Sequence, residues 1–108
     1  MKKILLIFLC LPMLVFAQQT YVPDDNFEQE LINLGYDNWL DNYVLTSNIS
    51  TLDSLSVSDL NIVDLTGIED FVSLTFLDCG YNQLSTIDIN QNILLKVLHC
   101  YGNQLTNL

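Results

Sequence analysis

The feature that most constrains this chain is an internal sequence repeat in its C-terminal half. The stretches LDCGYNQL (77–84) and LHCYGNQL (98–105) agree at five of eight positions and place Cys79 and Cys100 at equivalent points of a period of 21. One repeat offers about six apolar side chains, which gain roughly 10–15 kcal/mol on burial. Ordering the backbone of its ~21 residues costs about 1–2 kcal/mol for each residue. A single repeat therefore cannot fold alone, and we expect the copies to stack and share a core.

A third, more divergent copy precedes these two, with Val57 where they have cysteine and Leu60 where they have asparagine. Alternation of apolar and polar residues within each copy predicts a strand with one buried face. The segment 64–71 spaces its apolar residues by three, which predicts a tight helical turn. The segment 86–90 alternates and is predicted to be extended. The recurring positions are Leu52, Leu55, Val57, Leu60 and Ile62; Leu74, Leu77, Cys79, Asn82 and Leu84; and Leu95, Leu98, Cys100, Asn103 and Leu105.

This LxxLxLxxNxL pattern resembles the leucine-rich repeat family from about Leu52 to the end of the chain. The resemblance implies an α/β solenoid with parallel strands, a repeat period of 21–22 and a largely irregular convex side. It also implies that the asparagine side chains bond to turn backbone and form a ladder between repeats. Because Leu60 replaces asparagine in the first copy, we expect this ladder to begin at the second copy.

Residues 18–48 are predicted to form an N-terminal cap with a helix at about 25–34, and about three repeats, the last incomplete, occupy 49–108. Asp25 and Glu28 have the spacing of a capping box, and Gly35 can end the helix. The stretch 21–46 also resembles the N-terminal capping segment of exported leucine-rich repeat proteins from Bacteroidetes-type bacteria. The side chains expected on the inner face of the cap are Phe27, Leu31, Leu34, Tyr36, Trp39, Leu40, Tyr43 and Leu45.

The N-terminal segment 1–17 has the composition of a secretory signal peptide. Two lysines precede an apolar run (4–16), and Ala17 supplies the small residue before the expected cleavage site. This apolar run is too short to span a bilayer. We therefore expect export, with Gln18 as the new N-terminus, a secreted or cell-surface location, and no membrane insertion after cleavage.

Removal of this segment leaves Lys96 as the single lysine or arginine against 13 acidic residues, hence a net charge of −12. So strong a negative charge repels nucleic acid and anionic membranes. We therefore predict that neither is a partner.

The two repeat cysteines are predicted to be buried free thiols. The family pattern directs their position into the core, and Val57 shows that this position accepts a hydrophobe. Adjacent strands lie about 4.8 Å apart, a little more than the roughly 3.5–4.5 Å between the Cβ atoms of a relaxed disulfide. A disulfide between Cys79 and Cys100 would need local distortion, and the sequence leaves it open.

The sequence indicates no metal site, cofactor or catalytic set. His99 faces the opposite side of its strand from Cys100, so the two cannot bind one metal ion. The single histidine has no nucleophile on its own face in the neighbouring copy, and we expect it to pair with Asp78. Four oxygen-bearing residues occur close together but lack the order and the glycine of a calcium loop: Asp37, Asn38, Asp41 and Asn42.

The candidate binding residues are the outward side chains of the strands, which stacking aligns into one concave surface. Aromatic residues of the kind enriched at interfaces occur among them. The first copy contributes only Ser54, Ser56 and Ser58. The candidates in the second and third copies are Phe76, Asp78, Tyr81, Val97, His99 and Tyr101.

These features favour an exported, non-catalytic module that binds a protein ligand or mediates adhesion through its concave face. Two alternatives stay open: a spacer or targeting part of a larger secreted enzyme, and a glycan-binding module whose aromatic residues stack on sugars. Because the last repeat stops before a covering layer, we expect either a fragment of a longer array or self-association through the uncapped C-terminal end.

Overall fold

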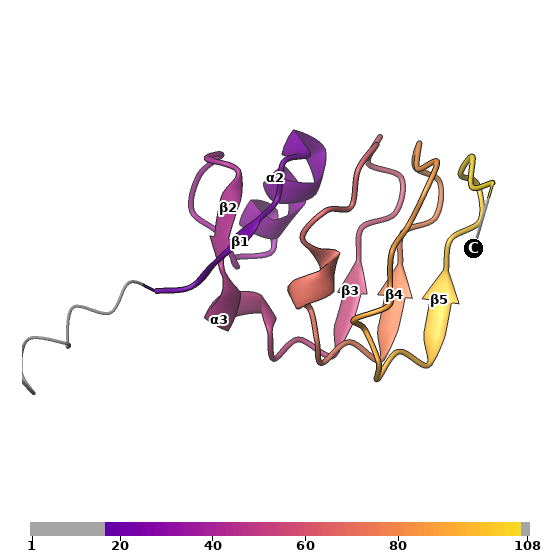
Figure 1. The fold of residues 1–108 in the computed structure, drawn as a ribbon. Helices are drawn as coiled ribbons and strands as arrows, with labels where there is room; N and C mark the ends of the chain where they lie inside the picture. The colour runs from indigo at the N-terminus through magenta and orange to yellow at the C-terminus, as the bar shows by residue number, and fades with distance from the viewer. Residues whose placement is uncertain (1–16, 107–108) are drawn as a thin grey trace, which may run out of the picture.

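The computed structural model describes residues 17–106, so the predicted signal peptide, apart from Ala17, and the last two residues lie outside the described residues. The elements in chain order are β1 (Gln19–Tyr21), α2 (Asp25–Asn33), β2 (Tyr43–Leu45), α3 (Thr46–Ile49), β3 (Ser54–Ser56), the 3₁₀ helix η2 (Ile68–Asp70), β4 (Phe76–Asp78) and β5 (Val97–His99). Figure 1 shows β3, β4 and β5 side by side, with α2, β1 and β2 at the end nearest β3.

The three repeats each contribute one strand to a parallel sheet in the order β3-β4-β5. Leu55, Leu77 and Leu98 lie in one row across this sheet, so equivalent positions of the repeats are in register. Leu77 is fully buried while its neighbours in β4 are half-buried, as expected for a strand with one face in the core. The strands predicted from the repeat pattern are therefore present in the predicted orientation.

The chain bends at the same point after every strand. The bend residue has a positive φ in all three copies: 57° at Asp59, 54° at Tyr81 and 75° at Gly102. Backbone hydrogen bonds continue the ladder through the bend, since Asp59 N donates to Gly80 O (3.0 Å) and Tyr81 N donates to Tyr101 O (2.8 Å). Because non-glycine residues rarely adopt this conformation, a repeated positive φ marks a turn that the whole array imposes.

The carboxamide of Asn82 holds this bend together. Its Oδ1 accepts hydrogen bonds from the backbone N–H groups of Leu60 (2.9 Å) and Ile62 (3.1 Å) in the first repeat. Its Nδ2 donates to the carbonyl oxygens of Val57 (2.9 Å) and Cys79 (3.0 Å), and also to that of Gly80 (3.2 Å). One buried side chain therefore satisfies backbone groups of two repeats.

Asn103 repeats part of this arrangement one copy later. It accepts from Leu84 N and donates to the carbonyl oxygens of Cys79 and Cys100, each at 3.0 Å. The ladder runs from the second copy onward, as predicted from the presence of leucine at position 60.

The connecting segments opposite the sheet are short and differ between repeats. The helical turn predicted within 64–71 is η2, and the residues 86–89 have no regular secondary structure. Asn92, which follows the second of these segments, contacts the first. Its buried Nδ2 donates to the carbonyl oxygens of Ile68 (2.9 Å) and Phe71 (3.0 Å). This side is therefore irregular, with backbone groups satisfied by a side chain instead of by a long helix.

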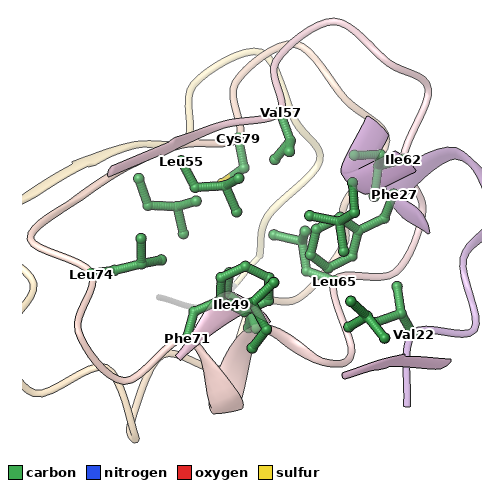
Figure 2. Close-up of a cluster of buried hydrophobic side chains, with 14 of the residues drawn as sticks. Val22, Phe27, Ile49, Leu55, Val57, Ile62, Leu65, Phe71, Leu74 and Cys79 are labelled. Carbon is green, nitrogen blue, oxygen red and sulfur yellow. The ribbon is translucent and has the colours of Figure 1, made fainter. Parts of the chain in front are cut away.

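The core is continuous from the N-terminal segment into the second repeat. Figure 2 shows side chains from α2, α3 and the first two repeats pointing into the same interior. Phe27 of α2 stacks on Phe71 with ring centroids 6.0 Å apart, and both side chains are fully buried. Helix α2 thus shares its buried face with the repeats, which are the only large apolar surface available to it among the described residues.

Helix α2 begins one residue earlier than the predicted capping box requires. Asp24 is the N-cap, and its Oδ1 accepts from Asn26 N (3.0 Å) and Phe27 N (3.1 Å). Its other oxygen accepts from Val63 N (2.9 Å) and Asp64 N (3.0 Å) in the first repeat. The predicted box between residues 25 and 28 was wrong because Asp24 serves both the helix and the repeat.

The packing predicted for residues 34–45 was also largely wrong. Strand β2 pairs with β1 in antiparallel register, and its single inward side chain is Val44, which is 1% exposed. This phase turns Tyr43 and Leu45 outward. Of the side chains predicted to lie inside, only Phe27, Leu31 and Tyr36 contact the core. The exposed ones are Leu34, Trp39, Leu40, Tyr43 and Leu45.

A glycine permits close contact between β1 and the first connecting segment. Gly67 has a φ of 109°, and a Cβ on it would lie 2.8 Å from the carbonyl oxygen of Tyr21. Beside this contact, Thr20 Oγ1 lies 2.7 Å from both Thr46 Oγ1 and Asp70 Oδ2. These contacts hold β1 against the repeats through backbone proximity and part-buried hydrogen bonds.

We predict that Asn82→Ala will lower the free energy of unfolding by at least about 3 kcal/mol, because each buried backbone group left without a partner costs about 1–3 kcal/mol. Urea titration followed by circular dichroism measures the loss. The matched control is the exposed neighbour in Gln83→Ala, which should change stability by less than about 0.5 kcal/mol. Equal stability of the two variants would show that the carboxamide does not support the bend.

Candidate binding surface

The strand face, defined here as the outer side of the β3–β4–β5 sheet with the bend residues that follow it, carries the predicted binding residues. The sheet register places Ser54, Phe76 and Val97 in one row and Ser56, Asp78 and His99 in the next. The first repeat therefore contributes two small hydroxyl side chains, and the larger side chains lie over the second and third repeats. The two stretches compared in the sequence thus carry most of this surface.

Four aromatic rings form a continuous row on the strand face. Phe76 and His99 meet edge to face with ring centroids 5.3 Å apart. His99 lies 5.7 Å from Tyr101, and Tyr101 meets Tyr81 edge to face at 5.5 Å. These separations are those of favourable aromatic pairs. Four of the six predicted residues are thus brought together in one row, and Tyr81 (61%) and Tyr101 (58%) remain largely exposed to solvent.

Glycine and tyrosine occur in reversed order in the second and third copies, and each glycine makes room for a tyrosine. The second copy reads Gly80-Tyr81 and the third reads Tyr101-Gly102. A Cβ on Gly102 would lie 2.5 Å from Cδ1 of Tyr81, and a Cβ on Gly80 would lie 3.1 Å from the carbonyl oxygen of Tyr101. Each glycine therefore leaves room for the tyrosine of the adjacent repeat. The reversal is visible in the sequence, although its meaning depends on the stacking of the repeats.

The predicted pairing of Asp78 with His99 was wrong, although the register sets these residues side by side. Asp78 Oδ1 accepts from Gly80 N at 3.0 Å, and no hydrogen bond joins it to His99 among the described residues. The imidazole packs between Phe76 and Tyr101 instead. Contact with two aromatic rings decides the orientation of the histidine.

The two cysteines lie behind the strand face, in the core layer that Val57 begins. Both are free thiols; Cys79 is fully buried and Cys100, in the last described repeat, is half-buried. Burial raises the pKa of the Cys79 thiol to about 12, and the neighbouring Cys100 and Asp78 act in the same direction. Because the thiolate is the reactive form, Cys79 is inert at neutral pH.

Other features of the described residues do not form a comparable site. A hollow of about 430 Å³ lies between the segments 64–69 and 86–91. Its carboxylates are engaged locally, since Asp64 accepts from Thr66, Glu69 from Gly67 N and Asp88 from Asn90 N. Within residues 17–106, the one group of histidine, cysteine or acidic side chains spaced to hold a metal ion is Glu28, Asp37 and Asp41, away from the strand face. No helix in this range is both long and apolar enough to cross a membrane.

A recurring sequence period, one parallel strand per repeat and hydrogen-bonded asparagines at the bends define the class: the chain is a leucine-rich repeat protein. It is 39% identical over 72 residues to Internalin J of Listeria monocytogenes, a match covering 67% of this chain and 8% of Internalin J. No family model matches the sequence.

Solved structures give the same result. The functional domain of InlJ from L. monocytogenes, described as including a cysteine ladder, matches with a TM-score of 0.74 and 35% identity over 88% of this chain and 22% of that one. An internalin, InlF, from the same species also matches with a TM-score of 0.74, at 19% identity over 82% of this chain and 26% of that one. The InlF likeness shows the fold alone. The chain spans less than a third of either structure.

We predict that N-ethylmaleimide at pH 8 will label Cys100 in the folded protein and leave Cys79 unmodified. The reason is that Cys79 is fully buried and its pKa of about 12 leaves almost no thiolate at this pH. Peptide mapping by mass spectrometry, before and after unfolding in guanidinium, measures both sites. Faster labelling of Cys79 than of Cys100 in the folded protein would contradict the assignment of Cys79 to the core.

Proposed function

We propose that this chain is an exported, non-catalytic binding module that recognises a protein ligand through its strand face, the concave face of the array. The single observation that carries the proposal is the row of four rings formed by Phe76, His99, Tyr101 and Tyr81. Two of these rings are more than half exposed although a monomeric protein gains stability by covering them. Tyrosine in this setting supplies contact area at low entropic cost on binding.

The rigidity of the strand face supports this role. The strands and bends are joined by a backbone ladder that continues to Tyr81 and Tyr101, so the two tyrosines project from a fixed backbone. Tyr81 also adopts a positive φ, which is unfavourable for an aromatic residue and which the surrounding repeats maintain. A surface ordered before binding loses less entropy when the ligand arrives.

A glycan is the second candidate ligand. Tyrosine rings can stack on sugars, but Tyr81 and Tyr101 cross at 78° and so do not present one flat platform. An edge-to-face pair instead presents an irregular surface that suits a side chain of a protein. We therefore rank a protein ligand first.

The similarity to internalins supports the same class of function. The matched region is a small part of each internalin, so the sequence also permits a spacer or targeting role within a larger secreted protein. We propose export to the cell surface or the medium on the basis of the predicted signal peptide. Binding by the strand face is therefore the property to measure.

We predict that replacing both exposed tyrosines will weaken ligand binding at least about 30-fold without unfolding the chain. The full chain is applied to an array of extracellular proteins and to a glycan array, and each positive is quantified by surface plasmon resonance. The variant combines Tyr101→Ala with Tyr81→Asn, because asparagine tolerates the positive φ at that position. Loss of an interface anchor of this kind costs at least about 2 kcal/mol, which is about 30-fold in Kd.

The matched control is Ile93→Ala, which removes an apolar side chain that is 83% exposed but belongs to the segment between β4 and β5. It should bind like the parent chain. Ligands that bind all three proteins equally would contradict the strand-face proposal. Positives confined to the glycan array would replace a protein ligand with a glycan.

A further inference from the structure

The acidic and basic side chains of the strand face carry charge of one sign. The three strands and the bends that follow them, residues 54–59, 76–81 and 97–102, contain Asp59 and Asp78 but no lysine, arginine or glutamate. Lys96 precedes β5, whereas the bends follow the strands, so this lysine lies at the opposite end of the strands from the bends. The bend end of the strand face therefore has two carboxylates and no lysine or arginine to balance them.

Both carboxylates have oxygens that are free to bind a partner. Asp78 Oδ1 accepts from Gly80 N at 3.0 Å, while its Oδ2 accepts no hydrogen bond from the described residues and is open to solvent. The side chain of Asp59 is exposed and likewise accepts no hydrogen bond from residues 17–106. Asp24 and Asp64, in contrast, accept from the backbone of their own turns. The acids of the strand face are thus not fully used by the fold.

The two acids lie beside the two exposed tyrosines. Asp59 is the bend residue of the first repeat, as Tyr81 is of the second, and its N–H donates to the carbonyl oxygen of Gly80, which precedes Tyr81. A Cβ placed on Gly80 would lie 3.3 Å from Asp78 Oδ1 and 3.8 Å from Cδ2 of Tyr101. A carboxylate oxygen and a tyrosine ring therefore meet at one point of the strand face, and a second carboxylate lies one repeat away.

The tyrosine rings can contact a cation at the same place. Tyr81 and Tyr101 cross at 78°, and in an edge-to-face pair each ring keeps at least one face that the other ring does not cover. The face of an aromatic ring is partially negative and attracts a cation within about 6 Å of the ring centroid. The guanidinium group of arginine stacks on such a face and can donate to a carboxylate at the same time. Rings and carboxylates together favour a positive ligand group and disfavour a negative one.

We propose that the bend end of the strand face binds an arginine side chain from a basic segment of a protein ligand. Tyr81 and Tyr101 contact the guanidinium group, and Asp59 and Asp78 accept its hydrogen bonds. This inference rests on the strand-face binding proposed above and adds the chemistry of the ligand. Residues 18–108 contain one lysine, no arginine and 13 acidic residues, and this charge steers a basic segment toward the protein.

Two labelled peptides test the inference on the full chain. One is a fluorescein-labelled peptide of alternating glycine and arginine, and the other has citrulline, which has nearly the shape of arginine without its charge. Fluorescence anisotropy measures both affinities. The arginine peptide should bind at least about 10-fold more tightly than the citrulline peptide. This difference should shrink as the salt concentration rises, because salt screens exposed charges.

The decisive variant combines Asp59→Asn with Asp78→Asn, which removes both charges and nearly preserves side-chain size. Asparagine also tolerates the positive φ at position 59. This variant should bind the arginine peptide at least about 10-fold more weakly than the parent chain. The matched control combines Asp25→Asn with Asp53→Asn, two exposed acids outside the strand face. It changes the net charge equally and should alter the affinity by less than about 2-fold at physiological salt.

Circular dichroism melts establish that each variant is folded. If the decisive variant does not fold, Asp59→Asn alone decides the outcome, because this side chain is exposed. It should weaken binding of the arginine peptide about 3-fold, as expected for an exposed ion pair.

Two results would overturn the inference. One is equal binding of the arginine and citrulline peptides. The other is an equal loss of affinity in the control variant, which would show nonspecific attraction to an acidic protein. Either result leaves strand-face binding in place if the combined Tyr81→Asn and Tyr101→Ala change still weakens binding of the array ligands. Array ligands that are insensitive to this tyrosine change would instead remove the strand-face proposal, and this inference with it.

Discussion

The hydrogen bonds of Asn82 are the interaction on which the rest of this solenoid depends. The chain must leave each strand through a sharp bend inside the protein, where water cannot satisfy the backbone. One carboxamide bonds to backbone groups on both sides of the bend and in both adjacent repeats. These bonds join the first repeat to the second, and Asn103 makes equivalent bonds between the second and the third.

The bend also determines what the outer surface can present. Tyr81 has a positive φ at its bend, and its ring lies against Gly102, the bend residue of the next repeat. Tyrosine and glycine alternate at this point, so that one ring fills the space which the next glycine leaves free. The aromatic row on the strand face is therefore a consequence of how the core is bonded, and its rigidity has the same cause.

Two acidic residues at the N-terminal end have opposite environments. Asp24 caps α2 and accepts from the backbone of the first repeat, so its charge contributes directly to holding the helix on the array. Glu28, one turn later, is fully buried and faces two more carboxylates. Burial and the nearby acids make a negative charge on Glu28 unfavourable. The same helix thus has one acid whose charge is stabilised by hydrogen bonds at its N-terminus and one that is buried beside two other carboxylates.

The sequence by itself determined the solenoid. The repeat period and the alternation around Leu77 and Leu98 predicted stacked strands, and the resemblance to leucine-rich repeats implied that these are parallel, that the asparagines bond to the bends and that the cysteines lie in the core. These are local patterns repeated in register, so each copy confirms the next. Cys79 is buried as predicted, whereas Cys100 is only half-buried. Strand alternation also predicted that Phe76, Asp78, Val97 and His99 point outward, whereas the position of Tyr81 depends on the bend that follows β4.

Only the tertiary structure decided the features that join segments without a shared period. The phase of β2, which turns Tyr43 outward, depends on pairing with β1. The N-cap moved to Asp24 because that residue also meets the first repeat, and His99 packs on aromatic rings instead of Asp78 because two ring contacts hold it. Likewise, Glu28 meets Asp37 and Asp41 only once α2 is packed on the core. A periodic pattern fixes contacts between equivalent positions, whereas contacts between unlike segments depend on how the folded chain brings them together.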